Sequence, residues 1–376
     1  MIYKDFQNLK LSQLGMGSMR LPVIGGDDAN IDEAAVSEMV TCAMEQGVNY
    51  YDTAWGYHDG NSETVMGKAL SEYPRESYYL ANKFPGYDLS NMDKVEEIFE
   101  KQLEKCRVAY FDFYLIHNVC ELNIDAYLDE KYGIFEYLMK QRKNGRIRRL
   151  GFSAHGSYEV MNRFLKAYGE HMEFGQIQLN YIDWSLQEAK GKVDLLNEYQ
   201  IPIWVMEPLR GGRLAKLSEE DTQKLKALRP DEETPAWAFR FLQSLPGVVM
   251  ILSGMSDLEQ LKDNIQTFET HQPLDTQEMK TLLSIADGIL DGIVPCTACR
   301  YCVSHCPQEL DIPSLIELYN EHSFTGGGFI APMALMAIPK EKQPNACVGC
   351  KSCEAVCPQQ IKIAEVLTDF TNKIGM

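Results

Sequence analysis

The residues with the strongest chemical signature in this chain are its cysteines. Eight of the eleven lie after residue 295, in two runs that share the spacing C-x2-C-x2-C-x3-C-P. Thiolates are soft ligands for iron, and this spacing is typical of a 4Fe–4S site. The runs consist of Cys296, Cys299, Cys302 and Cys306, and of Cys347, Cys350, Cys353 and Cys357.

In this motif the fourth cysteine, which precedes a proline, ligates the other cluster. We therefore expect crossed ligation, with Cys357 completing the cluster of the first run and Cys306 completing that of the second. A pair of zinc sites is the alternative, because C-x2-C pairs also bind zinc, but it leaves the third cysteine of each run without a role. The tail resembles two-cluster ferredoxin domains, which implies a small α+β fold around two 4Fe–4S clusters.

A second group of reactive residue types lies in the first half of the chain. It consists of Asp52, Tyr57, Lys83 and His117. Reduction of a ketone requires a hydride and a proton at the oxygen. Tyrosine, with an ordinary pKa of about 10, is a poor acid at neutral pH unless its neighbours ease ionisation. A lysine cation lowers the pKa of the phenol, a buried carboxylate keeps that lysine charged, and a histidine can share the substrate oxygen.

Taken singly, these residues have ordinary structural explanations. Asp52 is a candidate turn or helix-cap residue, Lys83 a candidate surface charge and His117 a candidate core histidine. Tyr57 is a candidate for loop packing. Together they favour a catalytic group, because the ends of consecutive parallel strands meet at one rim of a barrel.

The elements that must position this group alternate between strand and helix from about residue 30 to residue 290. Short β-rich runs are predicted at 11–19, 49–52, 78–83, 112–117, 149–153, 176–180, 203–206 and 248–253. Helical patterns are predicted at 33–46, 63–72, 93–106, 134–143, 158–168, 193–199, 235–244 and 258–268. Eight βα units in about 260 residues predict an α/β fold of the closed (β/α)8 barrel type. An open doubly wound sheet is the alternative, and the lack of a G-x-G-x-x-G after the first strand counts against it.

The order of Asp52, Tyr57, Lys83 and His117 on these strands resembles the aldo-keto reductase family, over residues 1–290. The resemblance implies a barrel that uses NADPH or NADH without a Gly-rich phosphate loop. It implies that Tyr57 is the acid/base, that Lys83 and Asp52 are its partners, and that His117 orients the carbonyl. The whole chain resembles the members of this family that carry a two-cluster ferredoxin domain.

The same resemblance implies a set of cofactor contacts. Ser153 and Gln176 would hold the nicotinamide carboxamide, and Met206 stands where the family often has a stacking aromatic residue. The other implied positions are Leu209, Gly211, Gly212, Ser253, Gly254, Gln260 and Asn264. Two departures matter. Ser153 is followed by Ala-His instead of Asn, and Gly254 and Gln260 offer no cation for a 2′-phosphate, which weakens the case for NADPH over NADH.

Composition limits the classes of partner. The chain has 376 residues, 36 Lys and Arg, 54 Asp and Glu, and a net charge of −18. This acidic excess repels polyphosphates and anionic lipids, so we expect neither nucleic acid nor membrane as a partner. No run approaches the ~18 apolar residues of a spanning helix, and the N-terminus has no apolar run typical of a secretory signal. We expect a cytoplasmic protein with a barrel at 1–290 and an iron–sulfur domain at 291–376.

These patterns predict an oxidoreductase that reduces a small-molecule carbonyl, or oxidises an alcohol, with NADP or NAD, and that carries two clusters for electron transfer. Nicotinamide transfers two electrons together, whereas each cluster passes one. The clusters are therefore either structural, or they supply electrons singly, and a redox partner protein is a candidate. The alternative function is an iron–sulfur electron-transfer protein whose barrel binds NAD(P)H without turnover.

Overall fold

The computed structural model describes residues 1–290, 292–296, 300, 302–357 and 359–376. Contacts among them divide the chain into two units, Met1–Ile285 and Ala286–Met376. Helix α12, Thr276–Leu290, crosses this division. The domain boundary after residue 290 remains a prediction.

The first unit is built on parallel strands. Among the described residues, eight of them close into a barrel in the order β10-β3-β4-β5-β6-β7-β8-β9. Their bounds are β3 (Leu14–Gly17), β4 (Tyr50–Asp52), β5 (Tyr79–Phe84), β6 (Phe111–Val119), β7 (Ile147–Ala154), β8 (Gly175–Gln178), β9 (Ile203–Met206) and β10 (Val248–Gly254). Since β10 pairs with β3, the predicted (β/α)8 barrel is confirmed and the open sheet is excluded.

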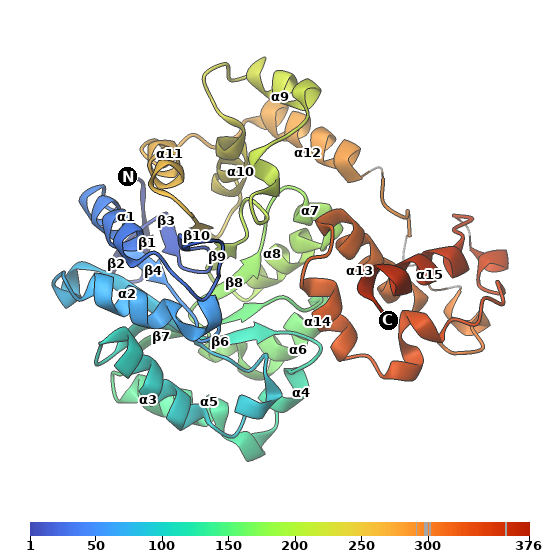
Figure 1. The fold of residues 1–376 in the computed structure, drawn as a ribbon, viewed down its shortest axis with the longest axis horizontal. Helices are drawn as coiled ribbons and strands as arrows, with labels where there is room; N and C mark the ends of the chain where they lie inside the picture. The colour runs from blue at the N-terminus through green and yellow to red at the C-terminus, as the bar shows by residue number, and fades with distance from the viewer. Residues whose placement is uncertain (291, 297–299, 301, 358) are drawn as a thin grey trace. The chain divides into compact units, whose positions relative to one another are not determined.

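At least one helix follows each barrel strand, and helices cover the outside of the barrel, as Figure 1 shows. These helices are α1 (Glu33–Glu45), α2 (Ser62–Leu70), α3 (Val95–Cys106), α5 (Ile134–Lys143), α6 (Tyr158–Tyr168), α8 (Ala189–Glu198), α10 (Thr234–Gln243) and α11 (Leu258–Thr267). Because helices cover the outer face and side chains fill the interior, the strands are nearly continuous buried runs. All nine residues of β6 are buried.

The predicted first strand, residues 11–19, is wrong at its beginning. A hairpin of β1 (Tyr3–Phe6) and β2 (Leu9–Ser12) precedes the barrel and takes Leu11 and Ser12. Its Phe6 packs on Trp204, with ring centroids 4.9 Å apart, in a core that also contains residues from the beginnings of several barrel strands. The hairpin therefore packs against the end of the barrel at which the strands begin.

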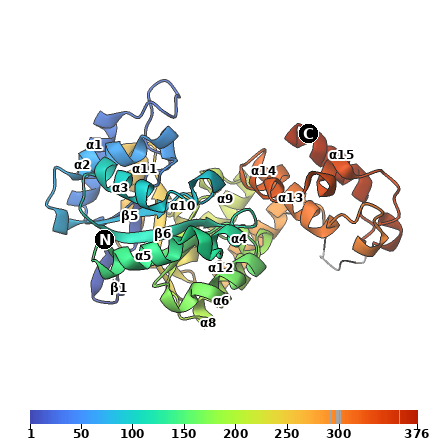
Figure 2. The same cartoon turned by 90° about the horizontal axis from the view of Figure 1, so that it is seen from below.

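The second unit has a small core of its own. Helices α13 (Ile312–Thr325), α14 (Ile330–Met336) and α15 (Ile363–Ile374) surround it, and α13 lies beside α15 in both views (Figures 1 and 2). Its buried residues include Cys302 and Cys353. The part of this unit that the structure describes contains helices and short 3-10 turns and no strand, so only the helical part of the expected α+β composition is found there.

Across the described residues, no helix is long and apolar enough to cross a membrane.

Candidate functional site

The ammonium of Lys83 is the centre of a buried polar group at the ends of β4 and β5. Its side chain is fully buried, and Nζ donates to Asp52 Oδ1 at 2.5 Å and to the Thr53 carbonyl oxygen at 2.9 Å. Tyr57 places its hydroxyl 3.4 Å from the same nitrogen. The structure therefore brings together three of the four residues that the sequence singles out for proton transfer.

Tyr57 begins a short 3-10 turn, Tyr57–Gly60, that follows β4. His58 and Asp59 have φ angles of 53° and 52°, a left-handed conformation that non-glycine residues rarely adopt. His58 is buried, and its Nε2 accepts the Leu21 N–H at 3.1 Å. Nδ1 therefore carries the proton and donates to the Asp28 carbonyl oxygen at 2.9 Å. These bonds hold the turn, and with it the direction of the Tyr57 ring.

The surroundings of these groups set their charges. Burial raises the pKa of Tyr57 above its ordinary value, and the Lys83 cation opposes that rise. For Lys83, burial alone would lower the pKa, but Asp52 and Tyr57 outweigh it, so the pKa is raised. Burial likewise raises the pKa of Asp52, and Lys83 opposes it. At neutral pH the group therefore contains a charged lysine and a protonated phenol. The Lys83 cation acts in the direction expected from the sequence, but burial outweighs it, so the expected net lowering of the Tyr57 pKa is not found.

His117 lies two residues before the end of β6, beside the Tyr57 ring. The two ring centroids are 6.4 Å apart with planes at 81°. Burial, followed by the Lys83 and His155 charges, lowers the pKa of His117 well below its ordinary value, so the imidazole is neutral. Its Nδ1 is buried and has no hydrogen-bond partner among the described residues. A neutral imidazole can still donate one N–H to a substrate oxygen.

Tyr87 adds a third ring to those of Tyr57 and His117, and no pattern in the sequence marks it. Its ring stands edge-on to His117, with centroids 5.4 Å apart and planes at 86°. Burial, followed by Tyr57, raises the pKa of Tyr87 to about 12. The Tyr87 hydroxyl is so close to Gly56 that a Cβ at position 56 would lie 2.3 Å from it.

Three of the predicted nicotinamide contacts lie side by side. Ser153 of β7 is paired in register with Gln176 of β8, and Gln176 Nε2 lies 3.7 Å from Met206 Sδ at the end of β9. Ser153 and Gln176 are buried, and Gln176 Oε1 has no hydrogen-bond partner among the described residues. A buried amide oxygen of this kind is suited to a polar ligand such as a carboxamide N–H.

The other predicted cofactor positions divide into two groups. Leu209, Gly211 and Gly212 form a loop after β9, in which both glycines have positive φ. Ser253, Gly254, Gln260 and Asn264 lie at and after the end of β10. In that second group the side chains are already engaged with each other or with nearby residues. Asn264 donates to Ser253 Oγ at 3.2 Å, and Gln260 donates to Asp257 at 2.7 Å while accepting from the Ser256 N–H.

The cysteines belong to the second unit. Cys299 lies outside the described residues. Cys302 and Cys353 are buried in its core, and Cys296, Cys306, Cys347 and Cys357 pack against that core, whereas Cys350 is exposed. Burial raises the pKa of Cys353 to about 11, and the neighbouring Cys306 and Cys347 thiols add to the rise. The last cysteine of the first run therefore lies near the second run, as crossed ligation requires, although no three described side chains of metal-ligating type already converge on one point.

Two further residues bear on the site. His155, two residues after Ser153, has a pKa lowered to about 4 by burial and then by Lys192. The unusual tripeptide Ser153-Ala154-His155 was the signal that could have identified it. Cys120, near His117 in sequence, is buried, and burial raises its pKa to about 11, so it is not a nucleophile at neutral pH.

A closed parallel barrel with an Asp–Lys–Tyr group at one rim, joined to a cysteine-rich unit, defines an oxidoreductase with an iron–sulfur segment. Residues 13–287 match the aldo/keto reductase family, and the chain belongs to it. Residues 295–362 match the 4Fe-4S dicluster domain, which supports iron–sulfur binding over zinc.

Individual relatives are distant and cover most of the barrel. The chain is 26% identical over 309 residues to the uncharacterized oxidoreductase YqkF of Bacillus subtilis (strain 168), which covers 74% of this chain and 93% of the relative. It is 24% identical over 304 residues to the NADH-specific methylglyoxal reductase of Escherichia coli (strain K12), covering 69% and 90%.

Solved structures show the same fold. An aldo-keto reductase from Bacillus halodurans in its holo form superposes with a TM-score of 0.58 and 24% identity, over 76% of this chain and 96% of its own. An aldo/keto reductase from Klebsiella pneumoniae in complex with NADP and acetate gives 0.60 and 19%, over 74% and 93%.

Proposed function

We propose that the barrel reduces a small-molecule carbonyl, or oxidises the corresponding alcohol, with a nicotinamide cofactor. The observation that carries this proposal is the position of the Lys83 ammonium, bonded to Asp52 and 3.4 Å from the Tyr57 hydroxyl. A buried cation next to a phenol serves a reaction in which that phenol gains and loses a proton.

Each of these side chains has a part in the proposed reaction. Tyr57 donates its proton to the carbonyl oxygen, and Lys83 stabilises the phenolate that remains. Asp52 keeps Lys83 charged and directed towards Tyr57. His117, which is neutral, donates an N–H to the substrate oxygen and so orients the carbonyl. The bound nicotinamide supplies the hydride that completes the reduction of carbonyl to alcohol.

We propose that Ser153, Gln176 and Met206 bind the nicotinamide end of the cofactor, and that the 209–212 loop and the residues after β10 bind the remainder. Gly254 and Gln260 supply no positive charge for a 2′-phosphate, which favours NADH. The Escherichia coli relative is named NADH-specific, whereas the Klebsiella pneumoniae structure contains NADP.

We propose that the second unit binds two 4Fe–4S clusters with crossed ligation. Four thiolates per cluster fit this group, and the nearness of Cys306 to Cys353 supports the exchange of the fourth ligand. The clusters then pass electrons singly to or from a redox partner protein, in a cytoplasmic setting.

Anaerobic purification with iron and sulfide analysis, followed by titration with NADH and NADPH and by turnover of carbonyl substrates, tests the whole proposal. We expect cofactor binding and turnover together. Binding without turnover of any carbonyl or alcohol would instead support a barrel that has lost its catalytic role beside an electron-transfer unit.

A further inference from the structure

A buried polar cluster bonds the backbone of Lys83, and none of its members takes part in the proposed proton transfer. Glu63 of α2, Asn82 of β5, Gln102 of α3 and Tyr114 of β6 are all 0% exposed. Burying a carboxylate costs free energy unless hydrogen bonds and a cation compensate it. The two oxygens of Glu63 are compensated by different parts of the site.

Glu63 Oε1 serves the strand that carries Lys83. It accepts hydrogen bonds from Asn82 Nδ2 at 2.9 Å and from Gln102 Nε2 at 3.0 Å. These two side chains in turn hold the Lys83 backbone. The Lys83 N–H donates to Asn82 Oδ1 at 2.8 Å, and Gln102 Nε2 donates to the Lys83 carbonyl oxygen at 2.9 Å. Tyr114 donates to Gln102 Oε1 at 2.5 Å, which determines how the Gln102 amide is oriented.

Glu63 Oε2 serves the loop that carries Tyr57. It pairs with Lys105 Nζ at 2.6 Å, and that ammonium lies over the Trp55 ring, 4.7 Å from its centre. Trp55 precedes Tyr57 by two residues. The same ammonium lies 3.8 Å from the point where a Cβ of residue 60 would stand, at the end of the Tyr57 turn. Lys105 therefore packs against the loop on both sides of Tyr57.

We propose that Glu63 is a positioning residue that sets the spacing between the Lys83 ammonium and the Tyr57 hydroxyl. This role rests on the proposed function. One oxygen holds the backbone from which Lys83 extends, and the other holds the loop from which Tyr57 extends. The carboxylate thus links the segments that carry Lys83 and Tyr57, and it contacts neither the Lys83 ammonium nor the Tyr57 hydroxyl.

Glu63→Gln is the direct test, because an amide has only one oxygen. Whichever way the amide turns, an N–H faces either Lys105 or the Asn82 and Gln102 donors, and one of the two connections is lost. We expect kcat for carbonyl reduction to fall by about tenfold to a hundredfold, as a small misplacement of catalytic groups does. The KM for the nicotinamide cofactor should change by less than about twofold.

The pH profile separates positioning from a merely structural effect. Reduction requires protonated Tyr57, so its rate falls as pH rises through the pKa of that phenol. When Lys83 is held less closely, it opposes the burial effect on Tyr57 less, and the pKa of the phenol rises. In Glu63→Gln the basic limb of the profile should therefore move to higher pH.

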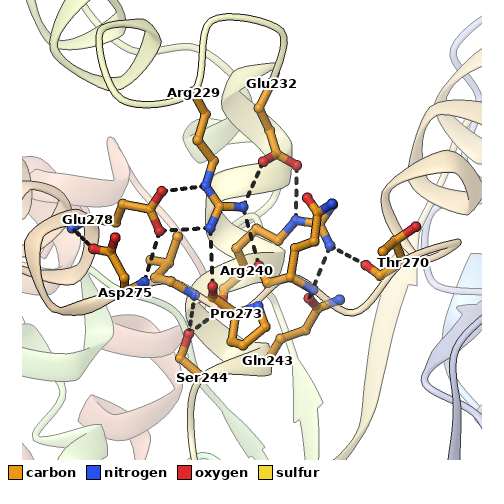
Figure 3. A network of polar contacts seen from close by, with 11 residues as sticks. Arg229, Glu232, Arg240, Gln243, Ser244, Thr270, Pro273, Asp275 and Glu278 are labelled. Atoms are coloured by element: carbon orange, nitrogen blue, oxygen red, sulfur yellow. Dashed lines mark hydrogen bonds and ion pairs between the residues drawn. The ribbon is translucent and has the colours of Figure 1, made fainter.

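Glu278→Gln is the matched control, in a second polar network of the barrel unit that Figure 3 shows. Glu278 is 8% exposed, and it accepts two hydrogen bonds from Arg229, at 2.6 and 2.7 Å, and one from the Asp275 N–H. Arg229 also pairs with Glu232, which bonds Arg240. This variant removes a partly buried ion pair from a network that contains no residue of the acid–base group, so it should lose stability without a change in the pH profile.

A second pair of variants keeps the test decisive if Glu63→Gln does not fold. Lys105→Met removes the cation from the Tyr57 loop and should displace the profile in the same direction, whereas Lys105→Arg keeps the ion pair and the ring contact and should restore it. Equal losses of kcat in Glu63→Gln and Glu278→Gln would overturn the positioning role. So would a basic limb of the pH profile that stays at the wild-type pH in both Glu63→Gln and Lys105→Met. Retained turnover in Tyr57→Phe would overturn the proposed function itself, so the two failures are distinct.

Discussion

The Lys83 ammonium lies 3.4 Å from the Tyr57 hydroxyl oxygen and 4.9 Å from the centre of the same ring. One cation therefore contacts both the oxygen that would carry the proton and the face of the ring that would share the resulting negative charge. Since Lys83 is fully buried, water screens this interaction little, and the ionisation of the two residues is coupled.

Tyr57→Phe should abolish most turnover, because the variant keeps the ring but has no proton to donate. We expect carbonyl reduction to fall by about 10²- to 10⁴-fold, as for loss of a general acid. Binding of NAD(P)H, followed by fluorescence titration, should stay close to wild type. Wild-type rates in this variant would mean that the barrel uses another acid.

Lys83→Met should lower stability as well as activity. Removing one partner of a buried ion pair leaves Asp52 as an uncompensated charge, at a cost of about 3–5 kcal/mol in the free energy of unfolding. Asp52→Asn in the same chain should recover most of that loss without recovering turnover. Urea unfolding of the single and double variants measures the loss of unfolding free energy and its recovery. A double variant no more stable than Lys83→Met would show that the lost stability has another source.

Acidification should destabilise the barrel through His155. Its pKa is about 4 in the folded chain, against about 6.5 for an unfolded histidine. The unfolded state thus gains a proton as pH falls below about 6.5 while the folded state does not, so stability present at pH 7 is lost towards acid. Between pH 7 and 5 the difference is about 2 kcal/mol.

His155→Gln removes that titration, so the variant should lose about 2 kcal/mol less unfolding free energy between pH 7 and pH 5 than the wild type. Urea unfolding at the two pH values measures this difference. Since other groups titrate equally in both proteins, the comparison isolates His155. Identical slopes for the two proteins would contradict a neutral, partly buried imidazole at this position.

Cys357→Ser should damage the cluster held by the first cysteine run and leave that of the second. Cys306→Ser should do the reverse, because Cys306 lies near Cys353. The wild-type protein should contain about eight iron and eight sulfide per chain, and paramagnetic resonance of each reduced variant shows which cluster is lost. Loss confined to a cysteine's own run would exclude crossed ligation, and stoichiometric zinc without sulfide would exclude the clusters.

The barrel could be predicted because local pattern and fold agree. The runs around Asp52, Lys83 and His117 are short, β-rich and bounded by helical periodicity, and they end where the strands end to within two residues. The hairpin was missed because Leu11 and Leu14 lie only three residues apart, and the single residue Gln13 that separates β2 from β3 is not a turn former such as Gly or Pro. Only the pairing of β1 with β2, a contact made through the fold, separates them.

The sequence was sufficient to predict which reactive residues form the site. It was not sufficient to predict which other residues hold them in position. Glu63 and Lys105 lie in two different helices, and nothing in the sequence marks them as a pair, yet Glu63 is 0% exposed and bonds Lys105 at 2.6 Å. Tyr87 carries no sequence signal, and only the fold shows that its ring stands edge-on to His117. Such roles depend on which helix meets which strand, and spacing along the chain does not carry that information.

The closeness of Gly56 to Tyr87 restricts how the mouth of this barrel can evolve. A Cβ at position 56 would stand 2.3 Å from the Tyr87 hydroxyl, so any other residue there requires the Tyr87 side chain to move. Because the Tyr87 ring also stands edge-on to His117, a substitution at position 56 acts on the surroundings of His117 through Tyr87. A directed-evolution library that varies position 56 should therefore vary position 87 with it.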